Sequence, residues 1–255
     1  LGESGVFLTN RDGGNAPNNF VVANAIHIEG NKVTKKHIIL REIPFSVGDT
    51  IQRISLQKNL TSTKENLLNT SLFNFVTIDT SSTPDGKMNF IVTVTERWYT
   101  WPVPIFEIQE RNFNVWWETK NLKRVNYGFL LNRENFRGRK EEVNLLVRFG
   151  YTERYGIAYN IPYLNNKQTL GMGTSFSYTR NKEIAYATFD NKLVYHKDED
   201  NYVRNELSAR ITLNYRKGIY NTQTFEVKFN SVNIADTVML LTNDYLNSNK
   251  TKLEF

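Results

Sequence analysis

The chain contains no cysteine and only three histidines among its 255 residues. Without cysteine it can form no disulfide bond, no thiolate metal site and no cysteine nucleophile. The absence fits an oxidising compartment, where stray thiols are a liability. Long apolar runs are also missing, because no stretch approaches the roughly 20 apolar residues that a membrane-spanning helix requires. Residues 1–19 are polar and rich in glycine and asparagine, unlike a signal peptide. These absences leave either a soluble cytosolic chain or a mature or trimmed one.

The residue types that could carry catalysis or bind a metal are sparse and scattered. The histidines, His27, His37 and His196, lie far apart in the sequence. Residues 2–5, Gly-Glu-Ser-Gly, lack the spacing of a nucleophile elbow. We therefore predict that the chain is not an enzyme, with no catalytic residue, no cofactor and no metal.

Basic residues exceed acidic ones, which gives a net charge of +6. A basic surface can bind nucleic acid or anionic lipid. The lysines and arginines form no compact run, however, so we interpret the excess as an ordinary solvated surface and expect no nucleic-acid partner. Mean hydropathy is low, at −0.49. A low value is also typical of membrane β-barrels, in which only every second residue of a strand faces lipid.

Residues 1–20 are predicted to form a flexible tail, and residues 21–100 a mixed α+β domain. The domain shows the order β-α-α-β-β. The expected elements are a strand at 22–29, a helix at 35–43 capped by Thr34, a helix that begins with the capping box at 62–65, and strands at 73–78 and 90–95. Pro102 and Pro104 discourage a continuous central strand, so the domain boundary is placed at 99–104.

Residues 105–255 are predicted to be nearly all β-strand. Residues 203–216 alternate: Leu207, Ile211 and Leu213 fall on one face, and Glu206 and Arg210 on the other. Four other segments repeat this pattern, at 125–131, 155–163, 170–178 and 224–230. Segments of about 10 to 14 residues suit tilted strands that cross a bilayer. A soluble β-sandwich or a lipocalin-like barrel, with its charged face in water, remains an alternative.

The order of the expected strands and helices in residues 21–97, and the turn residues between them, resemble a POTRA domain. The matching residues are Ile28-Glu29-Gly30-Asn31, Thr34, Ile39-Leu40-Arg41-Glu42, Gly48-Asp49, Leu67, Leu72-Phe73-Asn74-Phe75-Val76 and Val92-Thr93-Val94-Thr95-Glu96. The resemblance implies a small periplasmic domain with a β-α-α-β-β fold.

The strand-rich part resembles the barrel of the BamA/TamA superfamily. The matching residues are those of the turn at 132–139, of Leu145 to Gly150 and of the segment at 156–164. With the POTRA-like part, the resemblance covers residues 21–236. It implies a transmembrane β-barrel in the outer membrane of a Gram-negative cell. The expected fold class is therefore an α+β POTRA domain followed by an all-β antiparallel sheet, about half of a sixteen-stranded barrel, in a truncated chain. A small closed eight-stranded barrel remains an alternative.

The resemblance also implies a function and its sites. The chain would assemble, insert or translocate unfolded outer-membrane or secreted client proteins, with the lipid bilayer and accessory subunits as further partners. The client-binding POTRA edge strand would comprise Phe75, Val76, Thr77, Ile78 and Asp79. The first barrel strand would form a lateral seam that includes Arg111, Phe113, Val115, Trp116 and Trp117. The lumen would be lined by Arg148, Arg154, Arg204, Glu206, Arg210 and Lys228.

Two alternative functions remain open from the sequence. The same architecture could serve as a two-partner-type secretion pore or as the barrel anchor of an effector domain. A soluble periplasmic β-rich binding protein is the other alternative.

Overall fold

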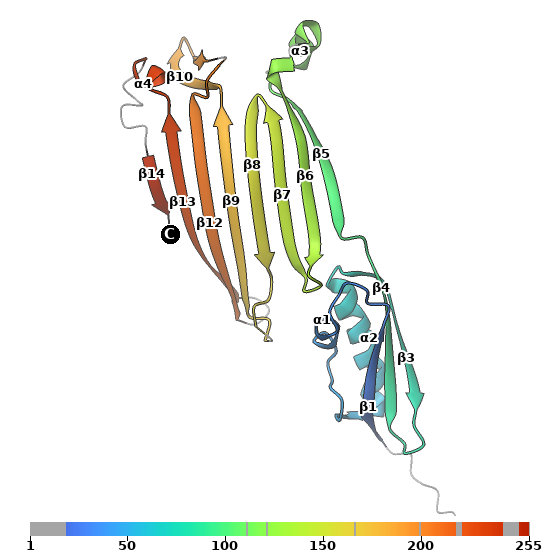
Figure 1. Ribbon diagram of the computed structural model, residues 1–255. Helices are drawn as coiled ribbons and strands as arrows, with labels where there is room; N and C mark the ends of the chain where they lie inside the picture. The colour runs from blue at the N-terminus through green and yellow to red at the C-terminus, as the bar shows by residue number, and fades with distance from the viewer. Residues whose placement is uncertain are drawn as a thin grey trace, which may run out of the picture. The chain divides into compact units, whose positions relative to one another are not determined.

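The computed structural model describes residues 19–110, 112–120, 122–165, 167–198, 200–217, 221–241 and 250–254. The chain forms two compact units (Figure 1). The first comprises Leu1–Asn31 and Ile39–Thr95, and the second comprises Lys32–Ile38 and Glu96–Phe255. Among the described residues, none of the helices combines the length and the hydropathy that a membrane-spanning helix needs.

The first unit is built on a four-stranded sheet with two helices. Its elements are β1 (Phe20–Glu29), α1 (Lys36–Leu40), β2 (Thr50–Gln52), α2 (Arg53–Asn69), β3 (Phe73–Ser82) and β4 (Met88–Glu96), although Lys36–Ile38 of α1 and Glu96 of β4 belong to the second unit. The strand order is β2-β1-β4-β3. The alternating strand β4 turns Phe90 and Val92 inward, where they are buried with Leu67 of α2 and Ile39. Phe45 packs on Phe90, with ring centroids 4.7 Å apart.

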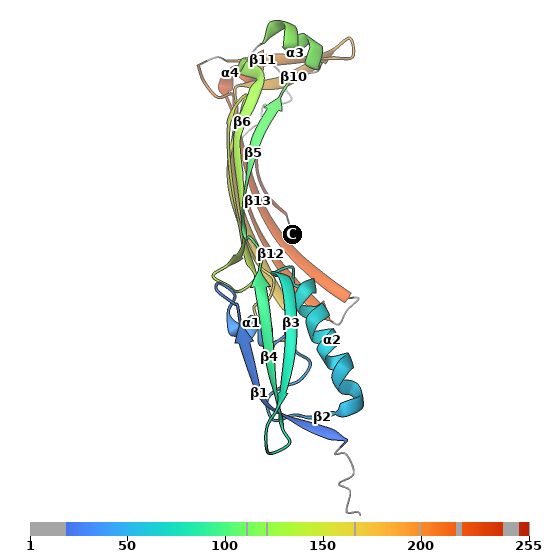
Figure 2. The same cartoon turned by 90° about the vertical axis from the view of Figure 1, so that its right-hand side faces the viewer.

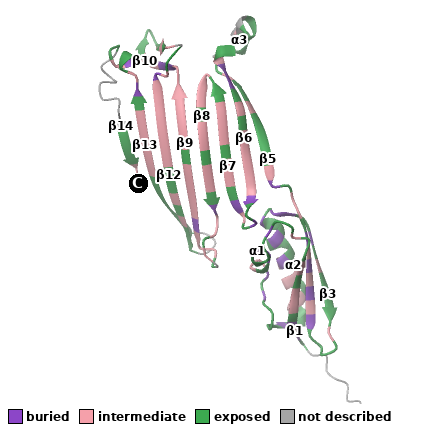
Figure 3. Ribbon diagram, viewed as in Figure 1, coloured by how far each residue is buried: buried purple, intermediate pink, exposed green. Residues whose placement is uncertain are grey.

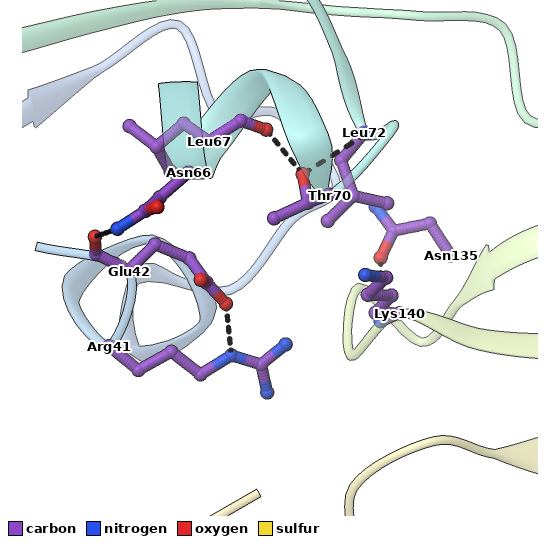
Figure 4. Close-up of polar contacts among 8 residues, drawn as sticks. All are labelled: Arg41, Glu42, Asn66, Leu67, Thr70, Leu72, Asn135 and Lys140. Carbon is purple, nitrogen blue, oxygen red and sulfur yellow. Dashed lines mark hydrogen bonds and ion pairs between the residues drawn. The ribbon is translucent and has the colours of Figure 1, made fainter. Parts of the chain in front are cut away.

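The second helix of this unit is longer than the sequence indicates. The capping box at 62–65 predicted a helix start, but α2 begins at Arg53 and runs through it without a break. Thr63 is buried, and its hydroxyl donates to the carbonyl of Asn59 at 2.8 Å, as expected inside a helix. Thr70 ends the helix and its hydroxyl donates to the Leu67 carbonyl (Figure 4).

The second unit is built on an eight-stranded antiparallel sheet in the order β14-β13-β12-β9-β8-β7-β6-β5. Its strands are β5 (Thr100–Ile108), β6 (Val125–Phe136), β7 (Glu141–Gly150), β8 (Thr152–Ile161), β9 (Leu170–Asn181), β12 (Arg204–Lys217), β13 (Asn221–Ile234) and β14 (Lys250–Glu254). Figure 2 shows the sheet nearly edge-on as a single curved layer. Over the described residues the sheet is open, with β5 and β14 at its edges.

We call the end of this sheet where β5 begins the near rim and the opposite end the far rim. At the far rim, β10 (Glu183–Phe189) and β11 (Lys192–Lys197) form a hairpin, and α4 (Asp236–Met239) follows β13. Ile184, Val203, Ile234 and Val238 are buried together there. The predicted fold class, a mixed α+β domain followed by an antiparallel sheet, is confirmed.

The prediction that residues 111–117 form the first strand of the sheet was wrong. Phe113, Val115, Trp116 and Trp117 lie in the helix α3 (Phe113–Thr119), and Arg111 lies outside the described residues. The side chain of Asn112 caps this helix by accepting a hydrogen bond from the amide of Asn114 at 2.9 Å. The first strand is β5 instead, which runs through Pro102 and Pro104.

Candidate functional site

The POTRA segment Phe75–Asp79 lies in β3, an edge strand of the four-stranded sheet. Val76 is buried, with 2% of its surface exposed, whereas Phe75 is 70% exposed. The buried side chain holds the strand on the domain, and the neighbouring positions leave its outer edge accessible. An open strand edge of this kind can receive an extended peptide by β-augmentation.

The strand β5 forms an edge of the larger sheet and pairs only with β6 among the described strands. Flanking bonds fix the direction of its backbone groups: Glu134 N–H donates to the Tyr99 carbonyl, and Gln109 N–H donates to the Arg124 carbonyl. Groups alternate along an antiparallel ladder, so the odd-numbered residues of β5 bond to β6 and the even-numbered ones point to the open edge. Pro102 and Pro104 occupy outward positions, where a missing N–H breaks no bond to β6.

The predicted lumen residues share one face of the eight-stranded sheet, which we call the polar face. Cross-strand partners in a sheet lie on the same face, and the register pairs Arg148 with Arg154 and Arg210 with Lys228. In β9, Thr179 pairs with Arg154 and Ser175 pairs with Arg210, so this strand places both pairs on the same face. The residues concerned are Arg148, Arg154, Arg204, Glu206, Arg210 and Lys228.

Acidic partners accompany most of these cations on the polar face. Arg148 lies 3.3 Å from Glu107 of β5, and Arg204 lies 2.8 Å from Glu206. Arg210 lies 3.5 Å from Glu226. Ion pairs at a partly exposed surface contribute little to stability. Their charges do, however, make this part of the face wettable.

The opposite face, which we call the apolar face, carries large hydrophobic side chains from β5 to β14. The register aligns Leu145 with Ile157, Ile157 with Phe176, and Ile211 with Val227. These residues stay exposed: Ile157 is 50% and Ile211 54% exposed, and Figure 3 shows no continuous buried layer along the sheet. A shallow hollow of about 380 Å³ lies among them. An apolar surface this extensive requires a cover of lipid or protein.

Aromatic side chains of β6, β7 and β8 cluster on the apolar face toward the far rim. Tyr127 and Phe149 have ring centroids 5.9 Å apart, and Phe149 and Tyr155 have centroids 5.7 Å apart. Near the other rim, Phe136 and Tyr159 meet edge to face at 6.2 Å. Aromatic side chains near both ends of an apolar band are typical of strands that cross a bilayer.

A buried hydrogen-bond network at the near rim was missed by the sequence analysis. Asn135 donates through Nδ2 to the hydroxyl of Thr34 at 2.8 Å, and that hydroxyl lies 3.2 Å from the hydroxyl of Tyr99. Lys140 N–H donates to Asn135 Oδ1 at 2.9 Å (Figure 4). Burial raises the pKa of Tyr99 above its usual value. Thr34 and Asn135 are 101 positions apart in the chain, so no local sequence pattern predicts their contact.

Two close backbone contacts complete this network. The Glu96 carboxylate accepts hydrogen bonds from the amides of Val33 and Thr34, and Lys35 N–H donates to the Gly138 carbonyl at 2.9 Å. Gly138 has φ +73°, and a Cβ there would lie 2.0 Å from the Val33 carbonyl oxygen. Only glycine fits this position. The turn after β6 is therefore tied to the 32–38 segment within the second unit.

Comparison with known proteins defines the class. Residues 21–97 match the family model described as "POTRA: Surface antigen variable number repeat". No curated protein sequence matches the chain. The chain is similar to the crystal structure of BamA from Haemophilus ducreyi lacking POTRA domains 1-3, with a TM-score of 0.61 and 14% identity over 91% of this chain and 42% of that one.

Two further solved structures are similar. They are CdiB from Acinetobacter baumannii, with a TM-score of 0.47 and 16% identity over 86% of this chain and 39% of that one, and CdiB from Escherichia coli, with 0.47 and 12% over 83% and 37%. The chain thus spans less than half the length of each structure. Residues 21–97 are thus similar to a POTRA domain, and the fold of the chain is similar to that of BamA, in which such a domain is followed by an antiparallel barrel-type sheet.

Proposed function

We propose that this chain acts at the outer membrane of a Gram-negative cell, where it inserts or translocates client proteins. The observation that carries the proposal is the edge of β5 in a membrane-type sheet, together with the edge of β3 in the POTRA-like domain, both of which are unpaired among the described strands. Unfolded clients expose strands with unpaired N–H and C=O groups, and open sheet edges are their natural binding sites.

The two faces of the large sheet support the membrane location. Lipid would cover the apolar face between the aromatic side chains near its two ends, and the polar face would line a wet lumen. In hydrocarbon every backbone group must be bonded, so β5 and β14 need partners there. The strand β5 then becomes the lateral seam, in place of the segment 111–117 that the sequence indicated.

The POTRA domain would stand in the periplasm, and the near rim of the large sheet would lie on the periplasmic side of the membrane, with the far rim on the outer side. The β3 edge, with Phe75 exposed beside the anchored Val76, would receive the client first. Accessory subunits would be further partners. No enzymatic step is needed, because the energy comes from pairing client backbone groups and burying apolar side chains.

The test uses the complete gene product. It is refolded with and without detergent micelles, and heated and unheated samples are compared by gel mobility. We expect a heat-modifiable, β-rich species that forms only with detergent. A monodisperse, fully folded protein without detergent would exclude the membrane sheet and leave a soluble periplasmic binding protein.

The client activity is then measured in phospholipid vesicles. An unfolded outer-membrane barrel is added to vesicles with or without the folded gene product, and its insertion is followed by its own heat-modifiable mobility. We expect faster insertion with the gene product. Vesicles that gain no insertion activity but pass a secreted partner would indicate the secretion pore, and vesicles that do neither would indicate an anchor.

A further inference from the structure

The open edge of β5 divides into two halves of different hydrogen-bonding capacity. Its outward positions are Thr100, Pro102, Pro104, Phe106 and Ile108, since the odd-numbered residues bond to β6. Every outward residue has a carbonyl, and that of Thr100 already accepts a hydrogen bond from Trp98 Nε1. Only the half toward the far rim, with Phe106 and Ile108, also offers consecutive N–H donors, because proline has none. A strand that pairs along β5 therefore loses two bonds, both in the near-rim half.

The near-rim half compensates with apolar side chains on both faces of the sheet. Pro102 and Pro104 belong to the apolar face, as the partners of Leu131 and Phe129 in β6. On the polar face, Trp101 is 46% exposed and Val103 48% exposed.

The apolar character of the polar face extends into the next two strands. Val103 faces Leu130 of β6, and Leu130 faces Leu146 of β7. Together with Trp101 and Ile105 these residues form an apolar patch, beside the seam, on a face that is otherwise charged. Strands with apolar residues on both faces are typical of strands covered on both sides.

We propose that β5 holds its partner in two modes: backbone pairing at Phe106 and Ile108, and side-chain packing at Thr100–Pro104. The partner is an exchangeable client strand that is apolar on both faces where it meets Trp101 and Val103. The near-rim half is the first to part when the client leaves. This inference rests on the proposed function, because it assigns the seam role to β5.

The missing donors argue for an exchanged strand and against a permanent one. In hydrocarbon, the partner carbonyls opposite Pro102 and Pro104 would stay unbonded, which is costly for a resting state. A client that passes through the seam carries that cost only briefly. Side-chain contacts have no fixed register, so they also suit clients of different sequence.

The experiment changes the donors and leaves the sheet intact. Pro102→Val with Pro104→Val restores two outward N–H groups and keeps apolar side chains. The complete gene product, which would carry a single engineered cysteine at Ile105, is reconstituted in phosphatidylethanolamine and phosphatidylcholine vesicles with a client barrel that carries one cysteine. The native chain has no cysteine to interfere. Disulfide trapping over time measures how long the client stays at β5.

We expect the double variant to release the client more slowly than the wild type, on the order of tenfold for two recovered bonds. Pro84→Val, in the hairpin loop of the POTRA domain, is the matched control and should release like the wild type. In the far-rim half, Phe106→Pro should reduce trapping strongly, whereas Phe106→Ala, which keeps the N–H, should retain most of it. Heat-modifiable mobility confirms that each variant is folded.

The outcomes separate this inference from the proposed function. If the wild type does not accelerate insertion, the proposed function fails. If the wild type is active and traps the client at β5, but folded Pro102→Val/Pro104→Val releases at the wild-type rate and Phe106→Pro traps as well as Phe106→Ala, only the two-mode seam is overturned. Trapping between two copies of the chain, in place of trapping with the client, would overturn the choice of partner.

Discussion

At the scale of single residues, two phenylalanines of β3 show how one strand can serve stability and binding separately. Phe73 is 5% exposed and belongs to the POTRA core, whereas Phe75, two residues later, is 70% exposed. An exposed aromatic side chain on an open edge contributes little to its own fold. It is well suited to anchor an incoming strand.

We therefore expect Phe75→Ala and Phe73→Ala to differ in kind. Phe73→Ala should lower the free energy of unfolding of the POTRA domain by about 3–5 kcal/mol. Phe75→Ala should change it by less than about 1 kcal/mol but weaken client capture at this edge by about 1–2 kcal/mol. Hydrogen exchange of β4 amides measures stability, and photo-cross-linking from Thr77 measures capture. Equal client capture by Phe75→Ala and the wild type would remove Phe75 from the site.

The near-rim network shows what sequence reasoning misses at this scale. Thr34 was expected to cap a helix. In the structure its hydroxyl accepts a hydrogen bond from Asn135 Nδ2 and also contacts the hydroxyl of Tyr99. A hydroxyl has similar partners in a cap and in a buried network, so its residue type cannot distinguish them. Only the fold brings the turn after β6 to Thr34.

At the scale of elements, alternation predicted β6, β8, β9, β12 and β13, because a period of two over many residues has one structural solution. It failed at the first strand. Prolines 102 and 104 suggested a break, but an edge strand tolerates proline when the missing N–H points outward. Trp116 and Trp117 suggested an interfacial strand, although Phe113, Trp116 and Trp117 are also spaced for one helical face.

The two faces of β12 give a direct test of the membrane assignment. Ile211, in the middle of the strand, is on the apolar face, and its neighbour Thr212 is on the polar face. We expect Ile211→Arg to lower stability in vesicles by about 2–4 kcal/mol, because arginine at mid-membrane faces lipid. Thr212→Arg, next to Glu226, should have a much smaller effect. Reversible guanidinium unfolding in vesicles measures both, and equal losses would mean that the apolar face does not meet lipid.

At the scale of the whole molecule, the order of the domains was predictable from the sequence, and the function depends on analogy. The POTRA pattern predicted an α+β unit, which the family match confirms over residues 21–97. The lumen role of the polar face stays a prediction, because shared sheet register does not show what covers each side.

Orientation can be measured because the native chain lacks cysteine. Lys192 lies in the β10–β11 hairpin at the far rim, and Lys167 lies in the turn between β8 and β9 at the near rim. Each is replaced by cysteine in a separate variant, Lys192→Cys and Lys167→Cys. With the POTRA domain in the periplasm, a membrane-impermeant maleimide should label Lys192→Cys on intact cells. It should label Lys167→Cys only after the outer membrane is permeabilised. The reverse pattern would contradict the proposed orientation.

The strict alternation of β12 has a consequence for how the chain travels before it folds. In β12 the apolar residues Leu207, Ile211 and Leu213 are each followed by a polar residue, so this segment cannot form an apolar helix before it pairs. Translocation machinery that retains segments of about 20 apolar residues would not retain a segment with this pattern. A segment of this pattern presents an apolar face only when strand pairing sorts its side chains, so a β12 that has not yet paired is a polar polymer.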